Sequence, residues 1–244
     1  MRLDVYLTEK GLVASRTEAK GFITSSAVKV DGKTVTKPSF DVTDGAIVEV
    51  DKSSKKYVGR GGLKLEAAIE VFGISVSGKR ALDIGASSGG FTDCLLQKGA
   101  KSVIAVDSGT NQLVDSLRSD GRVISIENYN ARYMKSSDLP YVPEICVMDV
   151  SFISATYIMP SIRNVLAPRA DFICLIKPQF EVGKSGLGKG GIVKNGKIRK
   201  EAVDKVVEFA NSIGFTLISL IESPIVGGDG NIEFLAHFQN GESI

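Results

Sequence analysis

The sequence of 244 residues has few of the side chains that build disulfide frameworks and metal sites: three cysteines, one histidine and no tryptophan. Cys94, Cys146 and Cys174 lie far apart and form no Cys-x-x-Cys pair, so no disulfide framework is evident. With His237 as the sole histidine, the chain has too few soft ligands for a structural zinc site. We therefore expect three buried free thiols, no metal, and a reducing, cytoplasmic compartment.

Long apolar runs are missing as well. The longest stretches without a charged residue are 150–162 and 209–221, of 13 residues each, whereas a membrane-spanning helix needs about 20. Asp4, Glu9 and Lys10 stand where a signal peptide would have its apolar core. These observations predict neither secretion nor a membrane partner, and they disfavour a membrane-lytic protein.

The composition is that of a globular protein, with 43% hydrophobic and 24% charged residues. The net charge of +2 is unevenly distributed: residues 1–64 contain 12 lysines and arginines against 8 acidic residues, a net of +4. The remaining chain contains 18 against 20, a net of −2. A basic head on a slightly acidic body favours a polyanion partner for the N-terminal part.

Two regions differ in their pattern. Up to residue 50 the expected elements are short: helices over 4–10 and 15–25, a hairpin turning at Asp31-Gly32, and a strand over 47–50. Residues 52–62, rich in serine, glycine and basic side chains, look like a linker. We therefore expect two domains, comprising residues 1–58 and 59–244.

Beyond the linker, apolar strands alternate with amphipathic helices, which predicts an α/β domain with a parallel sheet covered on both faces. The expected strands are 80–84, 102–106, 123–126, 145–148, 172–176, 215–221 and 232–237.

The first of these strands leads into a glycine-rich loop and then a helix, and Asp107 ends the second strand, 22 residues after Gly85. This spacing lets a carboxylate reach the ribose hydroxyls of an adenine cofactor. The glycines read G-x-x-x-G-G and not the dinucleotide pattern G-x-G-x-x-G. Asp83, just before the loop, would favour a positively charged ligand. We therefore expect S-adenosylmethionine in preference to a nicotinamide dinucleotide.

A second, dispersed group consists of Lys64, Asp149, Lys177 and Glu233. Asp149 and Lys177 follow neighbouring predicted strands, and open α/β sheets bind their ligands at the carboxyl ends of strands. Phe152, near this site, could stack on an unstacked nucleotide, but the sequence favours core packing for it, as for any single phenylalanine.

Four segments within residues 2–42, RLDVYL, SRTEAKGFI, VKVDGKTV and KPSFDV, resemble the ribosomal-protein-S-four-type RNA-binding module. The resemblance implies that basic side chains of the second helix and hairpin contact structured RNA. With one residue from the linker, the expected RNA-binding set is Arg16, Lys20, Lys29, Lys33, Lys37 and Arg60.

The segments RGGLKL, ALDIGASSGGFTDCLLQKGA, AVDSGTNQL, MDVSFIS, IKPQFEVG, KGGIV and NIEFLAHF resemble the hemolysin A (TlyA) family. That resemblance implies an FtsJ-like, Rossmann-like methyltransferase domain that methylates a ribose 2′-hydroxyl, of cytidine, in ribosomal RNA. It places a catalytic tetrad at Lys64, Asp149, Lys177 and Glu233. The implied cofactor positions are Asp83, Gly85, Ala86, Ser87, Ser88, Gly89, Gly90, Asp107, Asn130 and Asp149.

We expect Lys177 to accept or orient the proton of the 2′-hydroxyl, with Asp149 and Glu233 setting its charge and position and Lys64 stabilising the developing oxyanion. A non-catalytic RNA-binding or ribosome-associated protein is the main alternative. A DNA methyltransferase is disfavoured by the RNA-type head and by the lack of an N-P-P-[YF] motif after the fourth strand.

Overall fold

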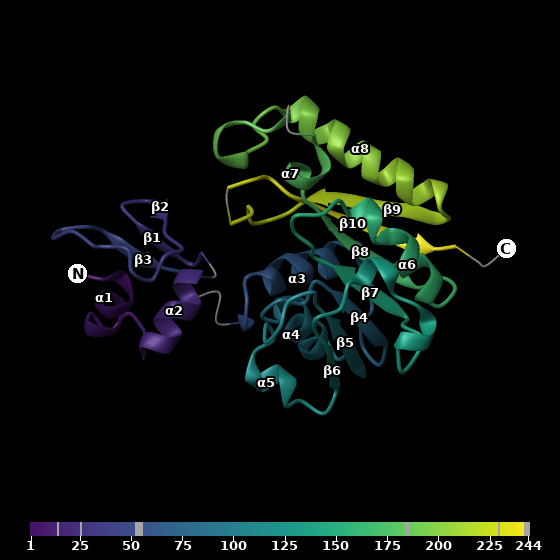
Figure 1. Cartoon of the computed structure of the whole chain (residues 1–244), viewed down its shortest axis with the longest axis horizontal. Coiled ribbons are helices and arrows are strands. Elements are labelled where there is room, and N and C mark those ends of the chain that lie inside the picture. The colour runs from purple at the N-terminus through teal and green to yellow at the C-terminus, as the bar shows by residue number, and fades with distance from the viewer. Residues whose placement is uncertain (14, 25, 52–55, 184–185, 229, 242–244) are drawn as a thin grey trace. The chain divides into compact units, whose positions relative to one another are not determined.

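The computed structural model describes residues 1–241 except 14, 25, 52–55, 184–185 and 229 (Figure 1). The chain divides into two compact units, Met1–Arg60 and Gly61–Ile244, and each is described by itself. The expected linker over 52–62 includes residues 52–55, which lie outside the described part.

The first unit consists of two short helices followed by a small antiparallel sheet of strand order β2-β1-β3. Asp31 and Gly32 adopt φ values of +50° and +74° between β1 and β2, the left-handed pair that a tight hairpin needs. The hairpin predicted from the sequence is therefore confirmed. The elements are α1 (Leu3–Glu9), α2 (Arg16–Thr24), β1 (Val28–Val30), β2 (Lys33–Thr34) and β3 (Val48–Val50).

The carboxylate of Asp4 is buried in the core of this unit. Asp4 on α1 is fully buried and accepts hydrogen bonds from the guanidinium groups of Arg2, at 3.0 Å, and Arg16, at 2.9 Å. These two bonds hold the pKa of Asp4 well below its usual range. The carboxylate thus ties the start of α2 to α1.

The second unit contains a seven-stranded sheet of order β6-β5-β4-β7-β8-β10-β9. The neighbouring strands from β6 to β8 pair in parallel, whereas β10 is antiparallel to both β8 and β9. The strands are β4 (Arg80–Ile84), β5 (Ser102–Val106), β6 (Val123–Ile126), β7 (Ile145–Met148), β8 (Asp171–Ile176), β9 (Phe215–Glu222) and β10 (Phe234–Asn240).

The antiparallel β10 departs from the parallel sheet predicted from the sequence. The chain joins β9 to β10 through residues 223–233, of which the described ones, 223–228 and 230–233, form no helix, and a parallel return usually needs a helical crossover. The two strands therefore pair as neighbours in opposite directions. A second difference is that Glu233, expected within the last strand, lies one residue before β10.

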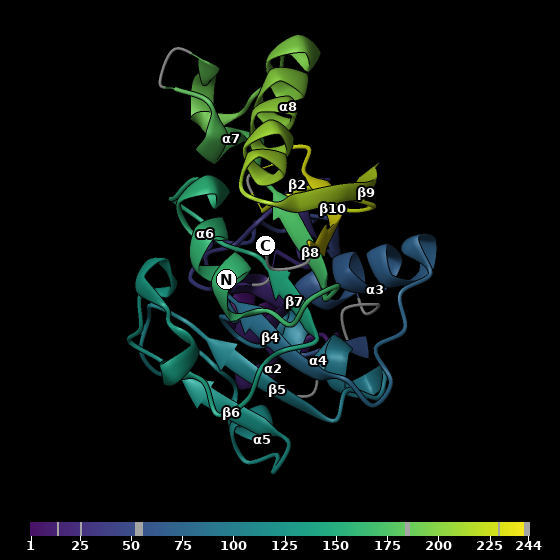
Figure 2. The same ribbon diagram turned by 90° about the vertical axis from the view of Figure 1, so that its right-hand side faces the viewer.

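Helices cover both faces of the sheet (Figure 2). Helices α6 and α8 pack on one face, where Val206 and Phe172 belong to the same buried cluster. Helices α3 and α4 pack against each other on the opposite face. Cys94, Cys146 and Cys174 are buried, as predicted, and none of them forms a disulfide bond within the part of the chain that the structure describes. The helices are α3 (Gly61–Phe72), α4 (Gly90–Gln97), α5 (Asp115–Arg118), α6 (Met159–Val165), α7 (Pro178–Glu181) and α8 (Gly196–Ser212).

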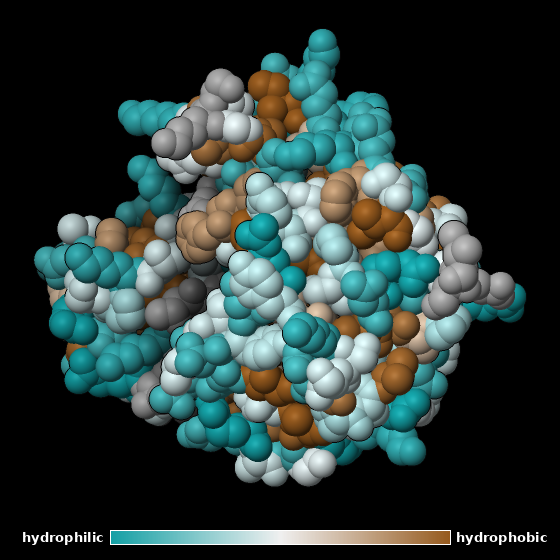
Figure 3. Space-filling model, turned by 45° about the vertical axis from the view of Figure 1, so that its right-hand side comes forward, coloured by the Kyte–Doolittle hydropathy of each residue, from teal (hydrophilic) through white to brown (hydrophobic). Residues whose placement is uncertain are grey.

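Within the described residues, no helix is both long and apolar enough to cross a membrane. On the face drawn in Figure 3, hydrophobic residues lie in small groups separated by hydrophilic ones.

Candidate active site

A pocket of about 470 Å³ opens at the carboxyl ends of β4, β5 and β7. This is the edge at which parallel α/β sheets bind their ligands. Five residues expected from the sequence to bind a cofactor line the pocket: Gly85, Ser87, Asp107, Asn130 and Asp149. The other expected cofactor residues are not in its lining: Asp83 is the next-to-last residue of β4, Ala86, Ser88 and Gly89 belong to the turn, and Gly90 begins α4.

The turn between β4 and α4 needs glycine at two positions. Gly85 has φ +82°, and a Cβ there would lie 2.3 Å from the carbonyl oxygen of Asp149. Gly89 has φ +101°, and a Cβ there would lie 2.2 Å from a methyl group of Leu117. Only glycine combines such φ values with such close approach, so the loop is fixed tightly against β7 and α5.

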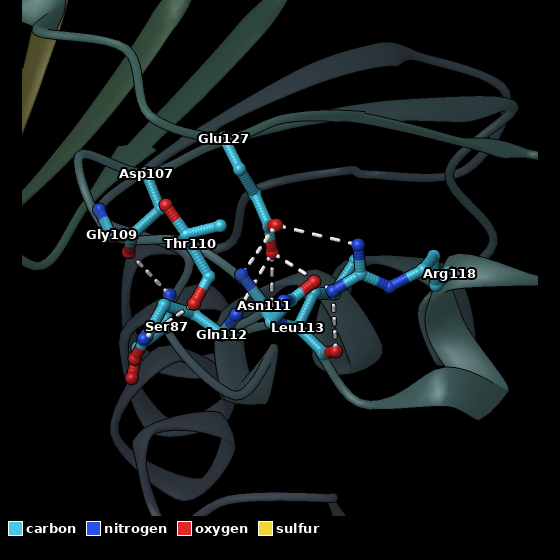
Figure 4. Close-up of polar contacts among 9 residues, drawn as sticks. All are labelled: Ser87, Asp107, Gly109, Thr110, Asn111, Gln112, Leu113, Arg118 and Glu127. Carbon is cyan, nitrogen blue, oxygen red and sulfur yellow. Dashed lines mark hydrogen bonds and ion pairs between the residues drawn. The ribbon is translucent and has the colours of Figure 1, made fainter.

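Asp107, directly after β5, joins two segments of the pocket wall (Figure 4). One carboxylate oxygen accepts a hydrogen bond from the backbone N–H of Ser87, at 2.8 Å, and the other from that of Gly109, at 2.7 Å. Each carboxylate oxygen has a second lone pair, so Asp107 can also accept hydrogen bonds from ligand hydroxyls.

Glu127 holds the next part of the wall and was not foreseen from the sequence. Its carboxylate accepts hydrogen bonds from three successive backbone N–H groups, at Asn111, Gln112 and Leu113, and from Arg118 (Figure 4). These bonds lower the pKa of Glu127 to about 2. Its position directly after β6, matching that of Asp107 after β5, was the available signal.

Asp83, expected beside the cofactor, is fully buried at the end of β4. One carboxylate oxygen accepts a hydrogen bond of 2.6 Å from the Thr92 hydroxyl. The other has no hydrogen-bond partner within the part of the chain that the structure describes. Burial raises the pKa of Asp83 to about 7, and the nearby charge of Asp149 adds to the effect.

The four expected catalytic residues form two lysine–carboxylate pairs. The Nζ of Lys177 lies 2.6 Å from Oδ1 of Asp149, and it donates a 2.8 Å hydrogen bond to the Ser151 hydroxyl. The Nζ of Lys64 lies 2.5 Å from Oε2 of Glu233, and both residues are buried. Asp149 and Ser151 line the pocket, so Lys177 contacts two of its lining residues.

The sheet register brings the two pairs to one edge. Phe234 pairs with Ile176, so Glu233 and Lys177 are the next residues beyond that pair on adjacent strands. Lys64 comes from the first turn of α3, which begins at Gly61, and a Cβ on Gly61 would lie 3.9 Å from Oδ2 of Asp149. The register thus places both lysine–carboxylate pairs at the carboxyl end of β8, and Asp149 of one pair lines the pocket. Such an arrangement is suited to moving a proton and stabilising charge on oxygen.

An exposed aromatic ring stands at the rim. The Phe152 side chain lines the pocket and is 91% exposed, and the residue has φ +64°, a strained conformation outside glycine. The rings of Phe152 and Phe180 lie 5.2 Å apart. Of the two alternatives left open by the sequence, core packing is therefore wrong.

The expected RNA-binding residues lie in the first unit. Lys20 on α2, Lys29 on β1, Lys33 on β2 and Lys37 just after β2 are exposed. Arg16 is also exposed, although its guanidinium group pairs with Asp4. Arg60 is half-buried at the last position of the unit.

Comparison with known families matches both units. The FtsJ-like methyltransferase family matches residues 57–240, and the S4 domain matches residues 1–48.

Relatives of known name span nearly the whole chain. Hemolysin A of Brachyspira hyodysenteriae is 45% identical over 98% of this chain and 99% of its own. The 16S/23S rRNA (cytidine-2′-O)-methyltransferase TlyA of Mycobacterium tuberculosis is 40% identical over 96% of this chain and 87% of its own. A solved structure of a Streptococcus thermophilus protein described as a hemolysin is 43% identical, with a TM-score of 0.80 over 100% of this chain and 89% of that one.

Proposed function

The chain belongs to the hemolysin A (TlyA) family of FtsJ-like methyltransferases, and from that premise we propose that it methylates a ribose 2′-hydroxyl of ribosomal RNA. The methyl donor is S-adenosylmethionine, and cytidine is the target nucleoside, as the name of the relative from Mycobacterium tuberculosis states for that protein.

The observation that carries this proposal is the position of the two lysine–carboxylate pairs. Asp149 both lines the 470 Å³ pocket and pairs with Lys177, so a group bound in the pocket lies directly beside an amine. A 2′-hydroxyl is a poor nucleophile that loses its proton as it attacks, and it therefore needs such a neighbour.

The pocket suits S-adenosylmethionine. The backbone at Gly85 lies against the carbonyl oxygen of Asp149, so no side chain fits at this position of the loop. Asp107 lines the pocket and can accept hydrogen bonds from ribose hydroxyls. Asn130, whose side-chain oxygen caps the turn over Ala131–Tyr133, lies at the adenine side in our assignment. When bound, the cofactor supplies an electrophilic methyl group on a positively charged sulfur, and the acidic side chains around the pocket favour that charge.

We assign the proton of the 2′-hydroxyl to Lys177, which accepts it as the neutral amine or orients the hydroxyl as the ammonium form. Asp149 holds that amine at 2.6 Å, and Ser151 accepts a hydrogen bond from it. Glu233 forms its ion pair with Lys64. We assign it an electrostatic effect on Lys177, which follows the neighbouring strand β8. Lys64 stabilises negative charge that develops on the attacking oxygen.

RNA is selected by the chemistry and by the first unit. A 2′-hydroxyl is present only in RNA, and the exposed lysines of the first unit suit contacts to phosphates. Phe152, exposed at the pocket rim, offers a ring on which an unstacked target base can lie.

The test is transfer of labelled methyl from S-adenosylmethionine to unmodified ribosomal subunits, followed by nucleoside mass spectrometry. We expect a 2′-O-methylated nucleoside from the wild-type protein, and a rate at least about 10²-fold lower for Lys177→Ala. Binding of S-adenosylhomocysteine, measured by calorimetry, should stay near the wild-type value.

Lys101→Ala is the matched control, because Lys101 is exposed directly before β5, at the end of that strand opposite to the pocket. Label on a base would contradict the assigned tetrad. RNA binding without any transfer would instead favour a non-catalytic, ribosome-associated role.

A further inference from the structure

Glu181 is a buried carboxylate that the mechanism above does not use. It is the last residue of α7, four positions after Lys177, and its side chain is 6% exposed. A buried carboxylate is costly unless hydrogen bonds satisfy it, so its partners indicate its role.

Both oxygens of Glu181 bind the segment that follows β7. One accepts a hydrogen bond of 2.5 Å from the Ser154 hydroxyl, and the other accepts one of 2.8 Å from the backbone N–H of Ala155. Ala155 begins a 3-10 turn over Ala155–Tyr157. The carboxylate of one strand-end segment therefore caps the first turn of the other.

These two segments carry the proposed reaction centre. Residues 149–155 include Asp149, Ser151 and Phe152, while residues 177–181 include Lys177 and Phe180. The Lys177–Asp149 pair joins the segments at the pocket, and the Glu181 bonds join them again at the far end.

The first segment needs such a restraint, because Phe152 holds a strained backbone conformation at φ +64°. The second is anchored from outside, because the Nζ of Lys205 on α8 donates a hydrogen bond of 3.0 Å to the backbone carbonyl of Glu181.

We propose that Glu181 is a positioning residue for methyl transfer: its carboxylate fixes the segment carrying Asp149 and Phe152 against the segment carrying Lys177. The inference rests on the function proposed above. It assigns Glu181 a larger effect on the rate of the chemical step than on cofactor binding, since Glu181 itself is absent from the lining of the 470 Å³ pocket and acts only through the segment that carries Asp149.

The test compares Glu181→Ala, Glu181→Gln and, as a control acid, Glu201→Ala, because Glu201 is exposed on α8. We expect Glu181→Ala to lower kcat for ribosomal subunits by roughly 10- to 100-fold, because small misplacements of reacting groups are costly. The KM for RNA and the Kd for S-adenosylhomocysteine should change little. Glu181→Gln should recover much of kcat, because the amide oxygen can still accept from Ala155.

Ser154→Ala provides a second variant of the same contact. If Glu181 acts through Ser154 and Ala155, the loss in the double variant with Glu181→Ala will be smaller than the sum of the single losses in log kcat. Additive losses, an unchanged kcat in Glu181→Ala, or equal loss of kcat and cofactor binding would each overturn the proposal.

Amide hydrogen exchange of residues 149–157 separates this proposal from the methyltransferase function. We expect faster exchange there in Glu181→Ala without any substrate. Faster exchange together with a wild-type protein that transfers no methyl group would support the contact but contradict the proposed function. Unchanged exchange would overturn the positioning role even in an active enzyme.

Discussion

At the residue scale, Asp83 shows how burial changes a side chain that the sequence assigned to the cofactor. Asp83 is not among the residues that line the pocket, and its carboxylate accepts a hydrogen bond from the Thr92 hydroxyl. Desolvation disfavours the charged form, so the pKa of Asp83 rises to about 7. A carboxyl group that protonates near neutral pH links the stability of this unit to pH.

Asp83 should destabilise the folded protein as pH rises. Between its unfolded pKa near 4 and its folded pKa near 7, the folded chain keeps a proton that the unfolded chain has lost, so stability falls across that range. We expect Asp83→Asn, which cannot ionise, to remove this dependence. The free energy of unfolding of Asp83→Asn, relative to that of the wild-type protein, should increase by a few kcal/mol between pH 5 and pH 8.

Urea unfolding followed by circular dichroism at the two pH values measures this difference. Asp93→Asn, an acid on the same helix as Thr92, provides the comparison. Parallel stability curves for wild type and Asp83→Asn would show that Asp83 stays ionised in the folded protein.

At the scale of elements, the pocket depends on loops that carboxylates hold by backbone hydrogen bonds. Glu127 binds the N–H groups of residues 111–113, and Gln112 from this loop lines the pocket. We expect Glu127→Ala to weaken binding of S-adenosylhomocysteine several-fold, because three donors lose their common acceptor and the wall loosens. Calorimetry measures the change, with Asp115→Ala on the neighbouring helix as the control acid.

Glu127 holds the loop only while its carboxylate is ionised. The pKa of Glu127 is lowered to about 2 in the folded protein, so its contribution is present above its unfolded pKa and is lost as the pH falls toward 2. Loss of cofactor affinity in Glu127→Ala should accordingly be the same at pH 6 and pH 8. A loss that varied between these values would point to another group.

The positions of the strands could be predicted from the sequence, whereas the contacts between separate elements could not. Alternation of apolar strands and helices placed β4 to β8 correctly, because buried parallel strands read as short apolar runs. The direction of β10 was missed, since pairing depends on the connection over 223–233 and not on the strand's own residues. Glu181 escaped notice for a similar reason: its partners, Ser154 and Ala155, come from another strand end.

At the scale of the whole molecule, our proposal assigns RNA recognition to the first unit and methyl transfer to the second. The change in composition around 52–62 predicted a division there, and the chain divides into its two compact units between Arg60 and Gly61. The roles of the exposed lysines stay a prediction, because exposure at Lys29, Lys33 and Lys37 shows only that phosphates can reach them. Salt dependence distinguishes a phosphate contact from a merely solvated charge, since each contact releases counterions from the RNA.

We expect the triple variant Lys29→Ala, Lys33→Ala, Lys37→Ala to bind ribosomal subunits more weakly and with a flatter dependence on salt. If all three lysines contact phosphates, the slope of log K against log [salt] should fall by roughly 2 to 3. Cofactor affinity should stay unchanged, because none of the three lines the pocket. Binding measured from about 50 to 200 mM salt tests whether these lysines contact phosphates, with Lys101→Ala as the control for one lost charge. A weaker affinity with an unchanged slope would mean that the substitutions disturbed the small sheet, and an unaltered affinity would move RNA recognition to other residues.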